Sequence, residues 1–370
     1  MREILFVVGE ASGDLHAGKV AEVVHEQRPD IPMVGLGGEY MRAAGVELLE
    51  HVDQLAVMGF VEVLAHVPKH WALLRMLRRR IATGRVGLVV LLDYPGFNVK
   101  VAEIAHRAGI PVLYYITPQV WAWGAGRLPK LAQVVTKAAS ILPFEESLLR
   151  AHGIDATFVG HPLLDRALDL PSSSAARAQL HLPATGEILA LFPGSRRAEL
   201  SRHLAPFIET ALELQRRRPN LHVVVSVAPT VKISSTDCPF PLVHGASFPV
   251  LRAATAGLLK SGTTTLEAAV AGLPHVIGYR TSVITAAIAK RLIKIPHIGL
   301  VNVVAGREVS REFLQNDLQA VPIANALEPL LTEGSRARAI AHGGLAEVRA
   351  MLGTPGAANR VAALAIGMLR

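Results

Sequence analysis

The chain has a single cysteine, Cys238, among its 370 residues. It therefore cannot form a disulfide framework or a cysteine-based metal cluster, and it fits a reducing compartment. Its fifteen histidines show no H-E-x-x-H or other zinc-binding spacing, so we predict no structural or catalytic metal. Aromatic residues make up only 5% of the chain, which leaves mainly aliphatic apolar side chains, as in buried parallel strands and their covering helices.

Long uncharged runs are also missing. The longest, residues 108–126, is interrupted by Pro111 and Pro118 and is typical of a strand and loop rather than a membrane-spanning helix. The first residues, MREILFVV, predict a strand and lack the layout of a signal peptide. We therefore expect a protein of the cytoplasm or of the cytoplasmic surface of a membrane.

Length and charge indicate two unlike halves. A chain of 370 residues suggests about two domains, and 51% hydrophobic residues exclude a disordered chain. Residues 1–165 carry 16 basic and 17 acidic side chains, a net charge of −1, whereas residues 166–370 carry 22 and 13, a net charge of +9. The second half therefore favours an anionic ligand, which could be a nucleic acid, a phosphorylated metabolite or a lipid head group. Nucleic acid is least favoured, because the basic residues are not interleaved with stacking aromatics.

Short apolar strands alternate with helices in both halves. In the first half we expect strands at 4–8, 33–36, 88–92, 111–116, 141–142 and 157–159. After a polar, Ala- and Ser-rich linker at 165–176 the pattern resumes, with strands at 188–192, 222–227, 257–259 and 275–277 and helices at 199–218 and 264–271. This alternation predicts an α/β fold of two doubly wound, Rossmann-like domains, with ligands in a cleft at the carboxyl ends of the strands.

Two strand-end loops of the first half carry acidic side chains. The turn at 9–14, GEASGD, holds Glu10 and Asp14 as candidate acids or bases, and its glycines would let backbone N–H groups approach a ligand. Asp93 ends an apolar strand and precedes YPGFN. A carboxyl there is poorly solvated, so its pKa is expected to rise toward the range of a general base. The alternative is a carboxylate that caps the next helix.

Two turns of the second half connect a strand to a helix and are rich in hydrogen-bond donors. The first, PGSRRAE at 193–199, brings Ser195 and Arg196 to a helix N-terminus, which indicates an anion site; the alternative is a Ser N-cap with surface arginines. The second, SGTTTLE at 261–267, offers donors that suit a diphosphate, although Thr264 and Glu267 also match a capping box. Two such turns in one basic half favour a nucleotide diphosphate.

Residues 66–85 predict a basic amphipathic helix. The segment contains no acid, and its basic side chains are Lys69, Arg75, Arg78, Arg79, Arg80 and Arg85. Its apolar surface comes from Trp71, Leu74, Met76, Leu77 and Ile81. Such a helix can lie at an anionic bilayer, where each nearby Lys or Arg contributes about 1 kcal/mol. The alternative, equally compatible with these residues, is a helix that packs on the sheet and leaves its basic face in water.

The loops together resemble those of the lipid-A-disaccharide synthase family. In the first half the matching segments are GEASGD at 9–14, MGFVEVL at 58–64, DYPGFN at 93–98, YYITPQVWAWGAGR at 114–127, LPFE at 142–145 and VGHP at 159–162. In the second half they are PGSRRAEL at 193–200, SGTTTLEAA at 261–269, GYR at 278–280 and LVNVVAGREVSREFLQ at 300–315. These segments follow the family order over about residues 4–320, and Lys260, directly before the second turn, departs from the family pattern.

The resemblance implies an inverting glycosyltransferase of family 19 with the GT-B fold, in which two Rossmann-like domains face a central cleft. The implied reaction joins UDP-2,3-diacylglucosamine to 2,3-diacylglucosamine 1-phosphate (lipid X) and releases UDP and a β-1,6-linked disaccharide 1-phosphate. It belongs to lipid A, and hence lipopolysaccharide, biosynthesis in Gram-negative bacteria. The family implies neither a cofactor nor a metal.

The resemblance also implies roles for single residues. Asp93 is the favoured base and Asn98 orders its loop, while Glu10 and Asp14 line the acceptor side, Glu10 with a catalytic part. Arg196 stabilises the leaving UDP, whose phosphates are held by Ser195, Arg196, Ser261, Gly262, Thr263, Thr264 and Thr265, with Glu267 on the ribose. The other nucleotide-side residues are Tyr279, Arg280, Asn302, Arg307, Glu312 and Gln315.

We thus expect residues 1–165 to form an acceptor-binding, membrane-facing domain, residues 166–350 a UDP-sugar-binding domain, and residues 351–370 a helix that returns to the first. The expected membrane residues are Trp71, Arg75, Arg78, Arg79 and Arg80, and residues 55–64 offer further apolar surface for acyl chains. The expected location is the cytoplasm, peripheral on the inner face of the inner membrane. We expect no nucleic-acid partner, and formation of a homodimer stays open.

Two alternatives come from other classes of protein. One is another GT-B enzyme of UDP-sugars, such as an epimerase or the peptidoglycan N-acetylglucosaminyl transferase, which would share the nucleotide-binding half. The other is a basic peripheral membrane protein without enzymatic activity, which would leave the Gly- and Ser-rich turns at the strand ends unexplained.

Overall fold

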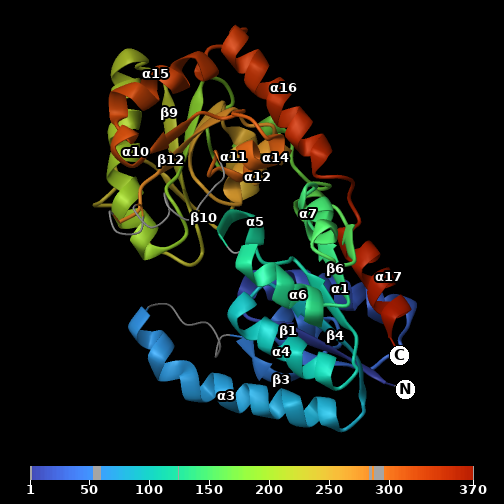
Figure 1. Cartoon of the computed structure of the whole chain (residues 1–370). Helices are drawn as coiled ribbons and strands as arrows, with labels where there is room; N and C mark the ends of the chain where they lie inside the picture. The colour runs from blue at the N-terminus through green and yellow to red at the C-terminus, as the bar shows by residue number, and fades with distance from the viewer. Residues whose placement is uncertain (1, 53–59, 124, 283–285, 287–295, 370) are drawn as a thin grey trace. The chain divides into compact units, whose positions relative to one another are not determined.

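The chain divides into two compact units in a computed structural model that describes residues 2–52, 60–123, 125–282, 286 and 296–369. Unit 1 comprises residues 1–165 and 353–370, and unit 2 comprises residues 166–352. Each unit contains one parallel β-sheet covered by helices, as Figure 1 shows for each by itself. The expected α/β fold with two doubly wound domains is therefore confirmed.

Unit 1 is built on seven parallel strands in the order β3-β2-β1-β4-β5-β6-β7. The strands are β1 Glu3–Val8, β2 Met33–Gly37, β3 Glu47–His51, β4 Val86–Leu92, β5 Val112–Tyr115, β6 Lys137–Ser140 and β7 Ala156–Phe158. The helices are α1 Ala11–Gln27, α2 Glu39–Ala43, α3 Phe60–Ala82, α4 Pro95–Arg107, α5 Val120–Trp123, α6 Leu128–Val134, α7 Glu145–Ala151, α8 Leu163–Arg166 and α17 Ala357–Met368, with a 3₁₀ turn at Ala125–Arg127. α8 crosses the boundary between the units.

The central strand β1 explains why the sequence begins with an unbroken apolar run. Leu5 and Val7 join the core on one face of the sheet, and Ile4, Phe6 and Val8 join the core on the other. Because successive side chains of a strand point to opposite faces, a strand covered on both sides must be apolar at every position. The same holds for β4, whose residues are all buried.

The C-terminal helix α17 belongs to unit 1. Its Val361 and Ala365 are buried in the same hydrophobic cluster as Val20 and Val24 of α1. Arg360 adds a hydrogen bond from its Nε to the carbonyl oxygen of Val159, at 2.8 Å. Figure 1 shows α17 in red beside α1 in blue, so the two ends of the chain complete one unit.

Unit 2 repeats the architecture with six parallel strands in the order β10-β9-β8-β11-β12-β13. They are β8 Ile188–Phe192, β9 His222–Val227, β10 Leu242–His244, β11 Ala256–Lys260, β12 His275–Tyr279 and β13 Glu312–Leu314. The helices are α9 Ser173–Gln179, α10 Arg197–Arg217, α11 Ser247–Ala253, α12 Thr264–Ala271, α14 Leu300–Ala305, α15 Ala320–Leu331 and α16 Arg336–Met351, with a 3₁₀ turn at Gln315–Asp317. The expected helix at 264–271 is confirmed at both ends.

One expected strand is wrong. The strand before α7 is β6 at 137–140, and not residues 141–142. Ile141 and Leu142 lie in the turn that follows, where their backbone N–H groups donate to the carboxylate of Glu145. The sequence of β6, KAAS, has no large apolar side chain, so hydropathy placed the strand on the next apolar residues instead.

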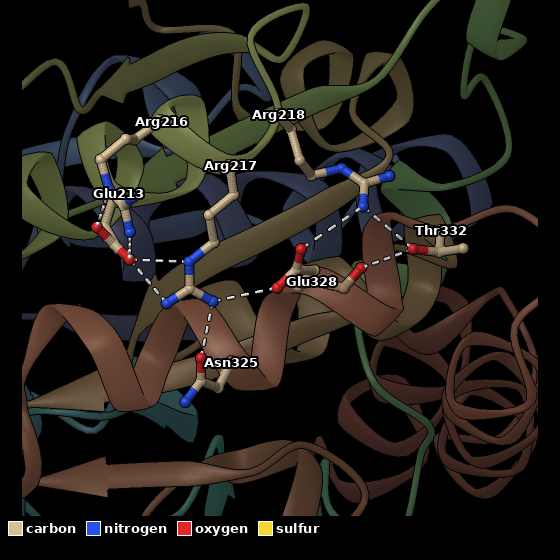
Figure 2. Close-up of polar contacts among 7 residues, drawn as sticks. All are labelled: Glu213, Arg216, Arg217, Arg218, Asn325, Glu328 and Thr332. Atoms are coloured by element: carbon tan, nitrogen blue, oxygen red, sulfur yellow. Dashed lines mark hydrogen bonds and ion pairs between the residues drawn. The ribbon is translucent and has the colours of Figure 1, made fainter.

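Arg217, the last residue of α10, and Arg218, which follows it, bind α15, as Figure 2 shows. Arg217 donates to Glu213 of its own helix at 2.8 Å and to Glu328 of α15 at 3.1 Å. Arg216 also pairs with Glu213, and Arg218 lies 4.0 Å from Glu328. Hydrogen bonds from the two arginines lower the pKa of Glu213 to about 2, so this carboxylate stays charged at neutral pH. Part of the positive charge of unit 2 therefore serves helix packing.

Candidate functional site

The loop between β4 and α4 holds Asp93 in a strained backbone. The φ angles of Asp93 and Tyr94 are +47° and +46°, and a left-handed residue other than glycine costs on the order of 1–3 kcal/mol. Asn98 fixes this shape, because its Nδ2 donates to the carbonyl oxygens of Leu92 at 3.0 Å and Asp93 at 2.9 Å. The hydroxyl of Tyr114 donates to the same Asp93 carbonyl at 2.6 Å. Asn98 thus orders the loop that carries the acid.

The carboxyl of Asp93 has the electrostatics of a general base. Burial and, to a smaller extent, the nearby carboxylate of Glu10 raise the pKa of Asp93 to about 6, while a hydrogen bond from the Tyr94 N–H works against them. Glu10 stands at the N-cap of α1 and accepts a hydrogen bond from the Ser12 hydroxyl at 2.8 Å. A base with a pKa near 6 is unprotonated at neutral pH and can still take a proton from a substrate hydroxyl. The two acids of this edge therefore form one electrostatic unit.

The glycine before Glu10 has a different task from the one expected. A Cβ on Gly9 would lie 2.2 Å from Cγ of Tyr94, so the absent side chain leaves room for the tyrosine ring. The Tyr94 ring also lies 5.6 Å from that of Phe97, centre to centre, and its hydroxyl bonds to Nε2 of His70. Gly9 therefore lets the strained β4–α4 loop pack on the first turn of the chain, and this packing rather than a ligand accounts for it.

Asp14 lies in the interior of unit 1 instead of lining an open surface. Its carboxylate accepts hydrogen bonds from the backbone N–H groups of Gly38 at 2.7 Å, Tyr40 at 3.0 Å and Met41 at 3.2 Å. These are the unpaired amides at the start of α2, which a carboxylate stabilises both as a cap and through the helix dipole. The structure thus corrects the expectation for Asp14, because both of its oxygens are used within the fold.

The turn after β8 places Ser195 and Arg196 at the start of α10. Arg196, and not a serine, is the N-cap residue, so the alternative of a Ser N-cap is wrong. The N–H of Ser195 donates to Glu199 at 2.9 Å, and its carbonyl accepts from the Thr230 hydroxyl at 2.6 Å. The side chain of Arg196 is 72% exposed and lies 3.7 Å from Glu199. Its guanidinium is therefore accessible to an anion.

The turn after β11 has two hydroxyls turned inward. Ser261 donates to the carbonyl oxygen of Ile298 at 2.8 Å, and Thr265 donates to that of Gly262 at 2.8 Å. Thr265 is fully buried and also accepts from the Val301 N–H at 3.3 Å. Both hydroxyls hold the turn against neighbouring segments. Of the expected phosphate ligands in this turn, Thr263 is the exposed one, while Gly262 and Thr264 are half-buried.

Glu267 is buried on α12 and does not form the capping box that its sequence position allows. The N-cap residue, Thr263, makes no side-chain cap, and Glu267 instead pairs with Arg166 at 3.2 Å. Burial raises the pKa of Glu267, and the charge of Arg166 acts in the opposite direction. The capping-box alternative is therefore wrong, and Glu267 is a buried, paired carboxylate.

Most of the remaining nucleotide-side residues connect segments of unit 2. Arg280 donates to the carbonyl oxygens of Gln315 and Leu318, and the Gln315 side chain accepts from the Thr281 N–H. Asn302 and Glu312 are joined by a hydrogen bond of 2.8 Å, and both accept backbone N–H groups of the surrounding loops. Arg307 pairs with Glu347 on α16, and we therefore do not count it among the residues of the two turns. These residues therefore order the loops of unit 2, and their contact with a nucleotide stays a prediction.

The sequence analysis did not single out Lys260, Glu199 or His203, which lie near these turns. Lys260 pairs with Glu199 at 2.9 Å, and His203 of α10 stacks on the Tyr279 ring with 5.6 Å between their centres. Burial lowers the pKa of His203 to about 4, so its neutral ring accepts the Arg280 N–H at 2.8 Å. Lys260 had been visible only as a departure from the family pattern. The other two lie inside helices, where a sequence gives no sign of what they touch.

The α3 helix divides the expected membrane residues. Leu74, Leu77 and Ile81 are buried in the core of unit 1, so they do not form an external apolar surface. Arg80 is also turned inward, with two hydrogen bonds of 2.6 Å to the buried Glu3. Trp71 is 60% exposed, and the exposed arginines are Arg75, Arg78 and Arg79. Of the expected apolar surface at 55–64, residues 55–59 and the side chains of residues 60–64 lie outside the described part of the chain.

A search of the described residues for metal-binding and membrane-spanning features gave neither. None of the described side chains form a group of three or more His, Cys, Asp or Glu residues suited to a metal ion. Among the described helices, none combines the length and the apolar character needed to cross a bilayer.

Solved structures similar to this chain have the GT-B fold. MurG of Acinetobacter baumannii aligns with a TM-score of 0.58 and 14% identity over 99% of this chain and 100% of its own. The calicheamicin glycosyltransferase CalG4 aligns with a TM-score of 0.63 and 17% identity over 100% and 98%. UDP-GlcNAc 2-epimerase of Neisseria meningitidis, bound to UDP-GlcNAc, gives 0.65 and 13% over 99% and 100%. At these identities the likeness shows the fold alone, and it confirms the GT-B expectation.

Sequence relatives narrow the assignment. A family profile described as lipid-A-disaccharide synthetase matches residues 4–363. Lipid-A-disaccharide synthase of Anaeromyxobacter sp. (strain K) is 41% identical over 100% of this chain and 98% of its own. The enzyme of the same name from Geobacter metallireducens is 38% identical over 100% and 97%. The resemblance inferred from the loop motifs is thereby confirmed, and the chain belongs to the lipid-A-disaccharide synthetase family.

Proposed function

We propose that this glycosyltransferase condenses UDP-2,3-diacylglucosamine with 2,3-diacylglucosamine 1-phosphate, with inversion at the donor sugar, in lipid A biosynthesis. Family membership over the whole chain and the GT-B fold support the class of reaction. The single observation that carries the mechanism is the half-buried carboxyl of Asp93, whose pKa is raised to about 6 in a loop fixed by Asn98 and Tyr114. The products are a β-1,6-linked disaccharide 1-phosphate and UDP.

Asp93 acts as the general base of the proposed reaction. Its carboxylate accepts the proton of the acceptor 6-hydroxyl while that oxygen attacks C1 of the donor sugar. Glu10 keeps the pKa of Asp93 high enough for this transfer, because a second carboxylate disfavours the charged form of its neighbour. Proton transfer to a positioned base contributes about 10²–10⁴-fold to a rate.

Unit 2 binds the nucleotide in this proposal. The diphosphate takes its charge-assisted hydrogen bonds from Arg196 and from the backbone of the turns at 193–196 and 261–264, and these donors stabilise the leaving UDP. Thr263 is the hydroxyl of the second turn that is exposed to a ligand. Ser261, Thr265, Asn302 and Glu312 act by positioning these turns, and Glu267 with Arg166 supplies the acceptor for a ribose hydroxyl.

The assay that tests this function supplies both lipid precursors to the purified chain. We expect a tetraacyl disaccharide 1-phosphate and one UDP per disaccharide, unchanged by EDTA, and neither product when the acceptor is omitted. Soluble UDP-N-acetylglucosamine replaces the acylated donor in a parallel reaction. Epimerisation or transfer from the soluble sugar, without disaccharide from the acylated pair, would overturn the proposal in favour of another GT-B enzyme.

A second proposal concerns the place of the reaction, which we assign to the cytoplasmic face of the inner membrane. A groove of about 690 Å³ between α3 and α4 has Trp71, Arg75 and Arg78 on one side and Lys100 and Arg107 on the other. Its apolar lining includes the partly buried Ile104, and the groove is floored by the core residues Leu74 and Ile81, which expose little surface of their own. The ammonium of Lys100 lies 5.4 Å from the centre of the Trp71 ring. Cations beside an exposed tryptophan suit an interface with anionic lipids.

Vesicle sedimentation tests this location. The wild-type chain should bind phosphatidylcholine vesicles that contain phosphatidylglycerol, and added salt should release it. Replacing Arg75 and Arg78 by Ser should weaken binding by about 1 kcal/mol per residue. Arg336→Ser, an exposed position on α16, serves as the matched control. Equal binding by the double variant and the wild type would remove α3 from the membrane contact.

A further inference from the structure

The adjacent ends of β8 and β11 are joined by an ion pair that the proposed mechanism does not use. The two strands are hydrogen-bonded neighbours, with Leu259 opposite Phe192, so the turns that follow them lie side by side. Lys260, the last residue of β11, places its Nζ 2.9 Å from a carboxylate oxygen of Glu199 on α10. The two side chains are only 18% and 13% exposed. This pair therefore connects the two turns assigned to the diphosphate.

Glu199 occupies the donors that a phosphate group would use. One carboxylate oxygen accepts the Ser195 N–H at 2.9 Å. The other is bound by the ammonium of Lys260, and the guanidinium of Arg196 lies 3.7 Å from the same oxygen. A backbone amide, a lysine and an arginine that converge on one anion are the usual elements of a phosphate site. Here the anion is a side chain of the protein itself.

The backbone of the turn is shaped for this close contact. Gly194 has a φ of +130°, and a Cβ at this position would lie 2.8 Å from a carboxylate oxygen of Glu199. On the other side, a Cβ on Gly262 would lie 3.3 Å from Nζ of Lys260. Both turns thus bring bare backbone to the ion pair. The Tyr279 ring, 5.8 Å from the ammonium, covers it from β12.

Glu199 remains charged in this position. Burial acts to raise its pKa, but the hydrogen bond and charge of Lys260 and the Ser195 N–H outweigh burial, so the pKa of Glu199 is lowered. A capping role alone would require only the bond to Ser195. The additional ammonium of Lys260, which comes from a neighbouring strand, is explained if a diphosphate can replace Glu199 as its partner. A diphosphate carries more charge and more acceptor oxygens than one carboxylate, and it can therefore displace it.

We propose that Glu199 is a built-in competitor for the diphosphate and that Lys260 transfers from Glu199 to the phosphates of bound UDP, as a further nucleotide-binding residue. This inference rests on the proposed nucleotide site of unit 2. In the ligand-free chain Glu199 keeps the cations and the Ser195 amide in place. When UDP binds, its phosphates take over these donors and the carboxylate turns away. The exchange makes the site selective for diphosphates over uncharged nucleosides.

Calorimetric titration of the full chain with UDP, and separately with uridine, tests the exchange. Lys260→Met should weaken UDP binding about ten- to a hundredfold, as expected for loss of a charge-assisted hydrogen bond, and Lys260→Arg should restore most of it. Glu199→Gln should bind UDP about three- to tenfold more tightly, because the competing charge is gone while an amide oxygen still accepts the Ser195 N–H. Uridine affinity should stay within about twofold throughout. Arg336→Met controls for the loss of one positive charge from unit 2.

The sign of the Glu199→Gln effect separates exchange from a purely structural pair. If the pair only fixed the turns, both Glu199→Gln and Lys260→Met would weaken UDP binding, and the exchange would be wrong. Wild-type UDP binding with all variants within twofold would overturn this inference and leave the proposed function intact. A wild-type chain that binds neither UDP nor uridine would overturn both. Melting temperatures identify any variant that fails to fold. If Lys260→Met does not fold, the UDP affinity of Lys260→Arg decides between exchange and a purely structural pair.

Discussion

In both units the loops of interest follow the carboxyl ends of parallel strands, but the loop of unit 1 carries an acid and those of unit 2 carry cations. After β4, the carbonyl oxygens of the turn are satisfied by donors, the Asn98 amide and the Tyr114 hydroxyl, and the side chain left over is an acid. After β8 and β11, amides and cations are satisfied by an acceptor, the carboxylate of Glu199. A turn held by hydrogen-bond donors thus leaves an acidic side chain that can accept a proton. A turn held by an acceptor leaves amides and cations that can bind an anion.

In the proposed reaction this contrast divides the chemistry between the units. A general base needs a carboxyl whose charged form is disfavoured, and the edge of unit 1 supplies burial and a second acid for Asp93. A diphosphate needs donors in fixed positions, and the edge of unit 2 supplies Arg196, Lys260 and the Ser195 amide.

Replacing the base should have the largest effect. Asp93→Asn should lower turnover about 10²–10⁴-fold, because the amide cannot accept the proton. Asparagine tolerates the left-handed backbone of this position, so the fold is expected to persist. Initial rates with both lipid precursors measure the change. Turnover near that of the wild type would remove Asp93 from the role of base.

Loosening the base loop should affect stability and rate together. Asn98→Ala removes the bonds to the carbonyl oxygens of Leu92 and Asp93 from a buried position. We expect the free energy of unfolding in urea to fall by about 1–3 kcal/mol. Turnover should fall beyond what the unfolded fraction explains.

The matched control is Asn359→Ala, at an exposed position of α17 in unit 1. It should change the free energy of unfolding by no more than about 0.5 kcal/mol. Equal destabilisation by the two variants would show that Asn98 has no special part in unit 1.

Neighbouring arginines of α3 should differ although their sequence context is nearly the same. Arg80→Met leaves the buried Glu3 without its partner and should lower the free energy of unfolding by about 1–3 kcal/mol. Arg79→Met, at an exposed position, should stay within about 0.5 kcal/mol. Urea denaturation of the two variants provides the comparison. Similar values would mean that the Arg80–Glu3 pair contributes nothing beyond a surface charge.

The smallest expected effect is a shift in pH dependence. In the wild type, turnover should fall as the pH drops through about 6, because Asp93 becomes protonated. Glu10→Gln removes a like charge, so the pKa of Asp93 should decrease and the midpoint of the profile should move to lower pH. Rates measured from about pH 5 to pH 8 test this. A midpoint that stays in place or rises would separate Glu10 from Asp93.

Much of the fold could be predicted because its central strands must be apolar on both faces. The runs at β1, β4 and β8 are fully buried; the sequence predicted both ends of β8, but it placed the start of β1 one residue late and that of β4 two residues late. The edge strands β3, β10 and β13 were not predicted, since they have polar or half-buried residues and no comparable apolar run, whereas the edge strand β7 was predicted to within one residue. β6 was misplaced for a related reason, because its small side chains give a weak hydropathy signal.

The candidate site was predictable in its loops and less so in its contacts. Asp93 stands out because a charged residue ends an apolar strand, and burial then raises its pKa as expected. Asp14 and Glu312 could not be told from ligand-binding acids, since their partners are backbone amides far away in sequence. Net charge also overstated the cations available to a ligand, because Arg217 and Arg218 pair with Glu328 of α15 and Arg216 pairs with Glu213 within α10.

The central claim, that unit 1 supplies the base and unit 2 the nucleotide site, is tested most directly by measuring UDP affinity and single-turnover rate for Asp93→Asn and Arg196→Met side by side. We predict that Asp93→Asn binds UDP as the wild type does and loses its rate, whereas Arg196→Met loses about tenfold or more in UDP affinity. If Asp93→Asn weakens UDP binding as much as Arg196→Met does, or if Arg196→Met binds UDP normally, the division of labour between the two units is contradicted.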